Sequence, residues 1–150
     1  MNENTAWADL PNAKYIDLVI ASLKKNAAIW NSASDTASNT VRNAAREAAW
    51  IAAWEAVYGA AWIAAWEAVW IAASDAAYGA AWGAAWDAVR ALIAWDDCGY
   101  LLDEKPEVVK MIALLGNQAA VLLYPACFAL NKSKELENNV TFKIVMPAFN

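Results

Sequence analysis

The amino-acid sequence predicts an all-α protein with one short β-strand at its C-terminal end. Hydrophobic residues make up 61% of the 150 residues, which excludes a disordered chain. Alanine, the residue with the highest helix propensity, recurs at a fixed spacing through the middle of the chain. Apolar and polar residues alternate near the C-terminus, which is typical of a half-buried strand. We expect one helical domain over residues 1–139 and a strand or tail over residues 140–150.

The N-terminal part predicts an amphipathic helix that begins near Pro11 and ends at about Lys25 or Trp30. Proline suits the first turn of a helix because its missing N–H would be unpaired there anyway. Apolar residues follow at helical spacing, namely Ile16, Val19, Ile20 and Leu23. In the polar stretch after this helix, Ser32 and Asp35 have the spacing of a helix start, so the next helical region is expected to begin there.

A tetrapeptide repeat over residues 44–91 forms the predicted scaffold. Each of its twelve units starts with alanine, has alanine or valine second, and in nine units has an aromatic residue third. A longer period of 20 residues is superposed, because the segment 56–69 recurs at 76–89. This regularity indicates duplication of short units. The repeat lacks the period-two alternation of a strand, so it predicts helix.

A period of four does not match the 3.6 residues of a helical turn, so the aromatic row drifts by about 40° per unit. Two arrangements remain open. Either the helix breaks near Gly59 and between Gly79 and Gly83, or one long helix is covered on all sides by neighbours. Breaks are favoured because glycine costs about 1 kcal/mol inside a helix.

The tryptophan column of the repeat is more typical of a core than of a ligand platform, since the small alanines let helices approach closely. The alternative is a surface on which nucleotide bases stack. The net charge of −5 lies entirely on the repeat, which has no Lys or Arg from residue 47 to 89 and five acids, Glu47, Glu55, Glu67, Asp75 and Asp87. This charge argues against nucleic acid as a partner. We interpret the acids as solvated positions, because they are too sparse to mimic DNA.

After the repeat, the pair Lys105–Pro106 predicts a boundary, and a short helix is expected from Glu107 to Leu115, ended by Gly116. The apolar segment 119–130 contains Pro125, which predicts a kink or a break. A polar linker is expected over 131–139. In the predicted strand beyond it, Val140, Phe142, Ile144 and Met146 alternate with Thr141, Lys143 and Val145.

The residue types present exclude several functions. The chain has no histidine, so Ser-His-Asp and Cys-His catalysis and histidine-ligated zinc are excluded. Cys98 and Cys127 are interpreted as reduced, half-buried thiols. Glu55 and Glu67 interrupt the apolar segment 48–73, so no membrane span is expected. No signal-peptide pattern opens the chain, which predicts a cytoplasmic location.

Three segments carry a resemblance to known proteins. They read LPNAKYIDLVIASLKKN, ALIAWDDCGYLLD and LLGNQAAVLLYPACFAL, with AAW-type repeats between the first and the second. Together they resemble small uncharacterised proteins encoded by bacteriophages and prophages, over residues 10–130. The resemblance implies a phage setting and the cytoplasm of a bacterial host. No activity is established for that group, so it implies no functional residues.

Two clusters are candidate sites. Four acids that follow the repeat offer oxygen ligands for Mg²⁺ or Ca²⁺ if helix continues through them, namely Asp96, Asp97, Asp103 and Glu104. The alternative is a polar surface at a helix end. A nucleotide-like ligand would need cations beside indoles, and the residues available for this are Arg42, Arg46, Arg90, Trp82 and Trp86. No glycine-rich phosphate loop occurs, and no cofactor is expected.

The function expected from these observations is that of a non-enzymatic phage accessory protein, which binds a host or phage protein and counteracts host defence. The first alternative is a binding protein for a nucleotide signal, with an aromatic-lined pocket. The second is a structural or assembly protein.

A homodimer or larger symmetric oligomer is also expected. Ten tryptophans are a large apolar load for one small domain. A lone strand leaves its backbone groups unpaired, and pairing with a second chain would satisfy them. The residues expected to form that contact are Thr141, Phe142, Ile144 and Met146.

Overall fold

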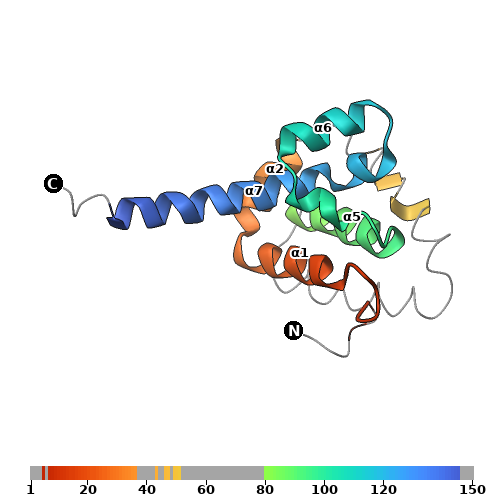
Figure 1. Cartoon of the computed structure of the whole chain (residues 1–150), viewed down its shortest axis with the longest axis horizontal. Coiled ribbons are helices and arrows are strands. Elements are labelled where there is room, and N and C mark those ends of the chain that lie inside the picture. The colour runs from red at the N-terminus through yellow and green to blue at the C-terminus, as the bar shows by residue number, and fades with distance from the viewer. Residues whose placement is uncertain are drawn as a thin grey trace.

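The computed structural model describes residues 5, 7–36, 43, 46–47, 49–51 and 80–145, and these residues form helices, turns and no strand (Figure 1). The helices in chain order are α1 (Ala13–Lys25), α2 (Ala27–Thr36), α5 (Ala80–Ala94), the 3-10 helix η1 (Gly99–Asp103), α6 (Pro106–Leu114) and α7 (Gln118–Val145). Residues 46–47 and 49–51, at the start of the repeat, are also helical. The predicted all-α class is confirmed for the described part of the chain.

Helix α5 lies at the centre of the helical body and packs against α1, α2 and α7. It contains the last part of the alanine-tryptophan repeat, and four of its alanines are buried in the core with Trp86, namely Ala84, Ala85, Ala88 and Ala91. Gly83 lies inside α5, so the helix does not break at this glycine. The cost of one glycine is small against the burial of the residues that follow it. The rest of the proposed break region, with Gly59 and Gly79, lies outside the described residues.

Helices α1 and α2 form the N-terminal part of the body. The first ends at Lys25, as the amphipathic pattern predicts. The second begins earlier than Ser32, because the backbone N–H groups of Ile29 and Trp30 already donate to the carbonyl of Asn26. Ser32 therefore lies inside a helix rather than at its start. The buried Trp30 fixes this position, since its indole Nε1 donates to the hydroxyl of Ser22 at 3.1 Å.

Helix α7 occupies residues for which the sequence predicts a linker, 131–139, and the start of a C-terminal strand, so both predictions are wrong for the described residues. It continues through Pro125 and ends at Val145, so residues 140–145 are its last turns, and Met146 lies outside the described residues. No Gly or Pro occurs between residues 126 and 146. Extending an existing helix costs far less than starting a new element, and this outweighs the β-propensity of a short alternating segment.

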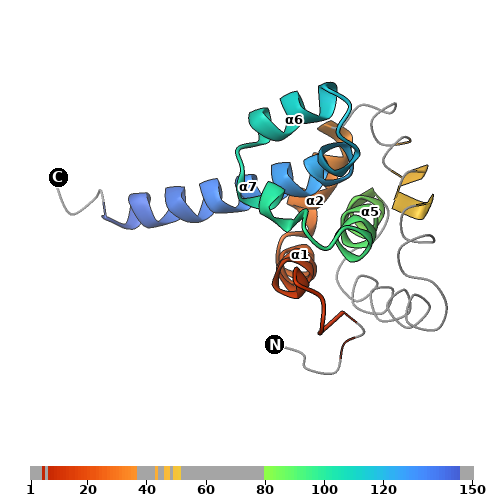
Figure 2. The ribbon, with the colours of Figure 1, turned by 45° about the vertical axis from the view of Figure 1, so that its right-hand side comes forward.

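The second half of α7 extends away from the other helices, as both views show (Figure 1, Figure 2). Its first half is covered by α2, α5, α6 and η1. Beyond Ser133 the side chains of residues 134–139 are exposed. In the described part of the chain, no helix is both long enough and apolar enough to cross a bilayer.

Candidate functional site

Arg90 is the centre of the predicted ligand cluster. Its guanidinium lies over two indole rings, 4.8 Å from the centroid of Trp86 and 5.3 Å from that of Trp50. The carboxylate of Asp87, the residue after Trp86, is buried and faces Arg46, with Oδ2 3.8 Å from Nε. The first two tetrapeptides of the repeat, which hold Arg46 and Trp50, thus contact the last two, which hold Asp87 and Arg90.

Burial governs the electrostatics of this cluster. It raises the pKa of Asp87 to about 6, against the opposing effect of Arg46 and Arg90. It lowers the pKa of Arg90 to about 10, against the opposing effect of Asp87. Arg90 is therefore still a cation at neutral pH, and its charge is balanced inside the protein.

The structure brings together Arg46, Arg90 and Trp86, three of the five residues predicted to hold a nucleotide-like ligand. Arg42 lies outside the described residues, and for Trp82 only the helical backbone is described. The face of the Arg90 guanidinium already contacts two indoles, and cation–π contacts of this kind stabilise packing. This arrangement joins the repeat helices to each other.

The four acids of the predicted metal site lie on three different local structures. A turn after the end of α5 carries Asp96 and Asp97, Asp103 is the last residue of η1, and Glu104 lies in the bend that follows η1. The shared face expected from a continuous helix is therefore lost. Asp103 instead accepts a hydrogen bond at 2.7 Å from the hydroxyl of Tyr15, and this bond raises the pKa of Tyr15. Among the described residues, no three acidic or cysteine side chains are grouped to hold a metal ion.

Both cysteines are free thiols, but they are buried rather than half-buried as the sequence predicts, because the apolar residues around them belong to the core. Cys98 donates to the carbonyl of Trp95 at 2.8 Å, and Cys127 to the carbonyl of Glu104 at 3.0 Å. Burial raises the pKa of Cys98 to about 12 and that of Cys127 to about 11. Neither thiol is a nucleophile at neutral pH, because the thiolate is the reactive form.

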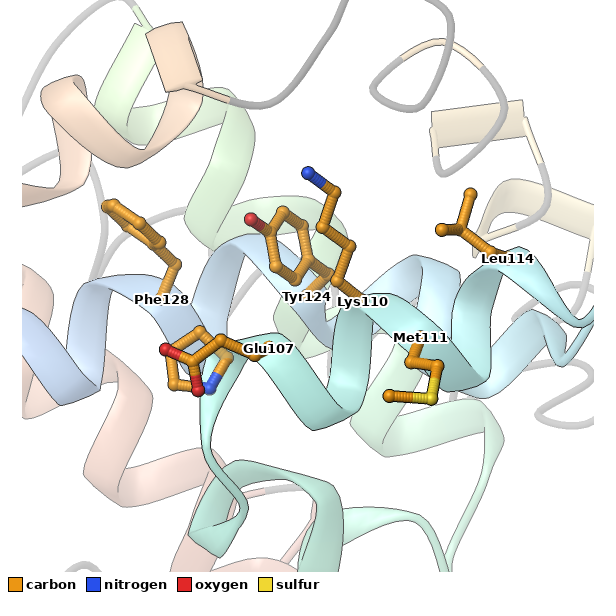
Figure 3. Close-up of a pocket in the computed structure, with 7 residues that line it drawn as sticks. Glu107, Lys110, Met111, Leu114, Tyr124 and Phe128 are labelled. Atoms are coloured by element: carbon orange, nitrogen blue, oxygen red, sulfur yellow. The ribbon is translucent and has the colours of Figure 1, made fainter.

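The groove between α6 and α7, here named the α6–α7 groove, was not found from the sequence. It has a volume of about 330 Å³, and Figure 3 shows the aromatic rings contributed by α7 and the longer, partly charged side chains contributed by α6. Its lining residues are Pro106, Glu107, Lys110, Met111, Leu114, Tyr124 and Phe128. Tyr124 and Phe128 are one turn apart, with ring centroids at 6.4 Å.

Helix α6 also exposes apolar side chains beside this groove. Met111 is 61% exposed, Leu114 78% and Leu115 83%, and we name these three residues the α6 surface. On the opposite side of the same helix, Val109 is fully buried. A helix that is apolar on all sides is normally covered on all sides. The sequence does indicate a helix with more apolar residues than one buried face needs, since Lys110 is the only polar residue from 108 to 115.

The residues predicted to mediate self-association do not form the strand on which that prediction depends. Thr141, Phe142 and Ile144 belong to the last turns of α7, and Met146 lies outside the described residues.

No protein-family model, curated protein or solved structure matches the chain. The features of the chain that bear on its function are therefore the α6–α7 groove and the α6 surface.

Proposed function

We propose that this chain is a non-enzymatic protein-binding module, and that the α6 surface with the α6–α7 groove is where it binds its partner. One observation carries the proposal: α6 buries Val109 on one side and exposes Met111 and Leu114 on the other, with Leu115 exposed directly after its end. Isolated exposed leucines are ordinary on protein surfaces. Three large apolar side chains on consecutive turns beside an aromatic groove form a contiguous patch, which is typical of an interaction site.

The partner that fits this surface is an amphipathic helix of another protein. Such a helix places apolar residues at i, i+3, i+4 and i+7, and lays them into an apolar groove. Glu107 and Lys110 lie on the groove with one charge of each sign, so the partner helix would carry a basic residue and an acidic residue flanking its apolar face. Full burial of each leucine or methionine side chain contributes about 1.5–3 kcal/mol, which is sufficient for a specific, reversible complex.

The resemblance to small phage proteins is the reason to propose a host or phage protein as the partner. The role proposed is to counteract host defence, in the cytoplasm of the bacterial host. A protein that works by occupying a partner's surface needs no catalytic group, and the proposal assigns none.

The experiment is capture from lysate of phage-infected bacteria, comparing wild type with Leu114→Ser. The matched control is Leu136→Ser on α7, since Leu136 is also exposed, at 49%, and lies outside the α6–α7 groove. We expect a protein captured by wild type and by Leu136→Ser and lost with Leu114→Ser. Calorimetry with that purified partner then measures a Kd that Leu114→Ser raises at least tenfold. Equal capture by all three proteins would refute the proposal.

Self-assembly is a second candidate, favoured by the half of α7 that extends from the body with Leu136 exposed (Figure 2). A helix without neighbours in its own chain gains burial when it packs against a second copy. Sedimentation of the full chain and of a chain truncated after Asn139 tests this. A species heavier than the 16.3 kDa monomer that is lost on truncation supports assembly, and a monomer at all concentrations excludes it.

The nucleotide-signal alternative depends on Arg90. A phosphate would have to draw the guanidinium away from Trp50 and Trp86, and the cation–π contacts given up would reduce the affinity. Calorimetric titration with cyclic nucleotides is the direct test of this alternative.

A further inference from the structure

A second cavity, of about 260 Å³ and open to solvent on one side, lies between α1 and the outer part of α7. Its lining follows one pattern on both helices, with residues at i, i+3, i+4 and i+7, which lie on one helix face. The lining residues are Leu18, Ala21, Ser22 and Lys25 on α1, Asn26 after it, and Leu130, Ser133, Lys134 and Glu137 on α7. Three of these residues have small side chains, Ala21, Ser22 and Ser133, which leaves space between the two helices.

Ser133 is the unusual group in this cavity. The residue is only 9% exposed, and its hydroxyl oxygen is buried without a hydrogen-bond partner among the described residues. The other serine of the cavity is different, because Ser22 accepts the indole N–H of Trp30 at 3.1 Å. A buried, unpaired hydroxyl costs stability, and in a native protein it calls for an explanation. An acceptor supplied by a ligand in the cavity would pair it.

The rim of the cavity is positive. Lys25 pairs with Glu137 across the opening, with Nζ 3.4 Å from Oε1. Lys134 adds a second ammonium, and it has no ion pair among the described residues. Two cations and one anion leave a local charge of +1 on a chain whose net charge is −5. A negatively charged group is therefore favoured at this position.

The wall of the cavity is apolar where Leu18, Ala21 and Leu130 line it. Taking about 30 Å³ for a water-sized group, the volume holds about nine non-hydrogen atoms. A ligand that satisfies all three features has an apolar chain of this size and a single anionic acceptor at one end.

We propose that this cavity binds a small amphipathic monocarboxylate, such as a medium-chain fatty acid. The alkyl chain lies against Leu18, Ala21 and Leu130, and the carboxylate accepts a hydrogen bond from the Ser133 hydroxyl beside the ammonium of Lys134. No lining residue is shared with the α6–α7 groove. The site and the partner-binding surface can therefore fail or succeed independently.

The test is a titration of the full chain with sodium octanoate, followed by the amide chemical shifts of α1 and α7. Octan-1-ol and octylamine are the comparison ligands, because they keep the chain and change the charge. We expect saturable shifts around the cavity, with octanoate binding at least tenfold more tightly than either comparison ligand. Equal affinity for octanol, or shifts confined to other helices, would refute the proposal.

Variants separate the contributions of the side chains. Ser133→Ala and Lys134→Gln are each expected to weaken octanoate binding about tenfold, since hydrogen bonds to charged groups are strong. Lys132→Gln is the matched control, because it removes the same charge from the same helix outside the cavity. Glu137→Gln is expected to strengthen binding severalfold, because Glu137 is the only acid among the described residues that line the cavity.

Ala21→Leu tests the cavity itself. Ala21 is exposed, so the larger side chain fills the open space without entering the core, and we expect octanoate binding to be lost. Ala28→Leu, at an exposed position of α2 outside the cavity, should leave the affinity unchanged. Unchanged affinity in Ser133→Ala, Lys134→Gln and Ala21→Leu would show that the ligand binds elsewhere.

Discussion

The side-chain amide of Asn12 donates a hydrogen bond to the backbone carbonyl of Leu92, 80 residues further along the chain. The same nitrogen donates to the carbonyl of Trp95 at 3.3 Å. Carbonyl groups at the end of a helix have no partner within that helix, and this side chain supplies a donor to the carbonyl of Leu92 in the last turn of α5. Asn12 stands directly before α1 and is 2% exposed. The contact therefore fixes the beginning of α1 to the end of α5.

Replacing Asn12 with alanine should lower the free energy of unfolding by about 1–3 kcal/mol, because the buried carbonyl of Leu92 loses its side-chain donor. Urea denaturation followed by circular dichroism measures this. Asn138→Ala on the exposed part of α7 is the control, with an expected change within about 0.5 kcal/mol. An Asn12→Ala protein as stable as wild type would show that the amide contributes nothing.

Asp87 should make stability depend on pH between about 4 and 6. Its pKa in the folded protein is raised to about 6, from an ordinary value of 3.8. In this interval the folded state binds more protons than the unfolded state, so the free energy of unfolding falls as pH rises and is constant above it. The size of the fall is about 2–3 kcal/mol.

Urea titrations of wild type and Asp87→Asn at a series of pH values from 4 to 7.5 check this dependence. The amide cannot ionise, so the variant should lose the decline that wild type shows in that interval. Asp35→Asn, at an exposed position of α2, should keep it. Parallel curves for wild type and Asp87→Asn would contradict the assignment.

Two glycines should respond to alanine in opposite directions. A Cβ on Gly99 would lie 2.8 Å from Cε2 of Tyr15 and closer still to Cδ2, so Gly99→Ala should cost about 1–3 kcal/mol through overpacking. At Gly83 the nearest atom is the guanidinium Nη2 of Arg46 at 3.3 Å, at the end of a side chain that is 55% exposed. Because that side chain can move, Gly83→Ala should stabilise α5 by about 0.5–1 kcal/mol.

Thermal unfolding of both glycine variants gives these signs directly. Adding Tyr15→Ala to Gly99→Ala should restore part of the loss, since the clash is with that ring. If the double variant is simply the sum of its two single changes, the Tyr15 contact is not the cause.

Cys98 and Cys127 should resist iodoacetamide in the folded protein at pH 8. Burial raises the pKa of both thiols well above that pH, so little thiolate is present, and the reagent has no access. Mass spectrometry should find no adduct on either native cysteine under conditions in which an added exposed cysteine, Asn138→Cys, reacts completely. Both native thiols should react once urea unfolds the chain. Labelling of either one at the rate of the added cysteine would contradict its burial.

Patterns of local spacing predicted α1, α6 and the helical nature of α5 well. Each depends on propensity and on apolar residues of one short segment, which the sequence displays directly. The C-terminal strand was mispredicted because alternation over 140–146 was considered apart from the helix before it. Whether a segment continues a helix depends on what precedes it, and the polar residues of 131–139 taken alone predict a linker.

The candidate sites were harder to predict, because they depend on which helices become neighbours. The α6–α7 groove joins Met111 to Tyr124 and Phe128 across a turn, and no short-range pattern reports that distance. The hydrogen bond from Tyr15 to Asp103 could not be predicted for the same reason, because the two residues are far apart along the chain. The contact of Arg90 with Trp50 and the ion pair of Arg46 with Asp87 could not be predicted from local spacing either, since each joins residues that are far apart along the chain.

Helix α7 is one continuous helix in two surroundings, with Leu122, Leu123 and Ala126 in the core and residues 134–139 in water. Amide hydrogen exchange is controlled by the opening reaction that each hydrogen bond requires. Amides up to about Leu130 should exchange only when the whole domain unfolds, and those at 134–139 through local opening. Protection factors along α7 should therefore fall by orders of magnitude near Ser133, with no change in secondary structure.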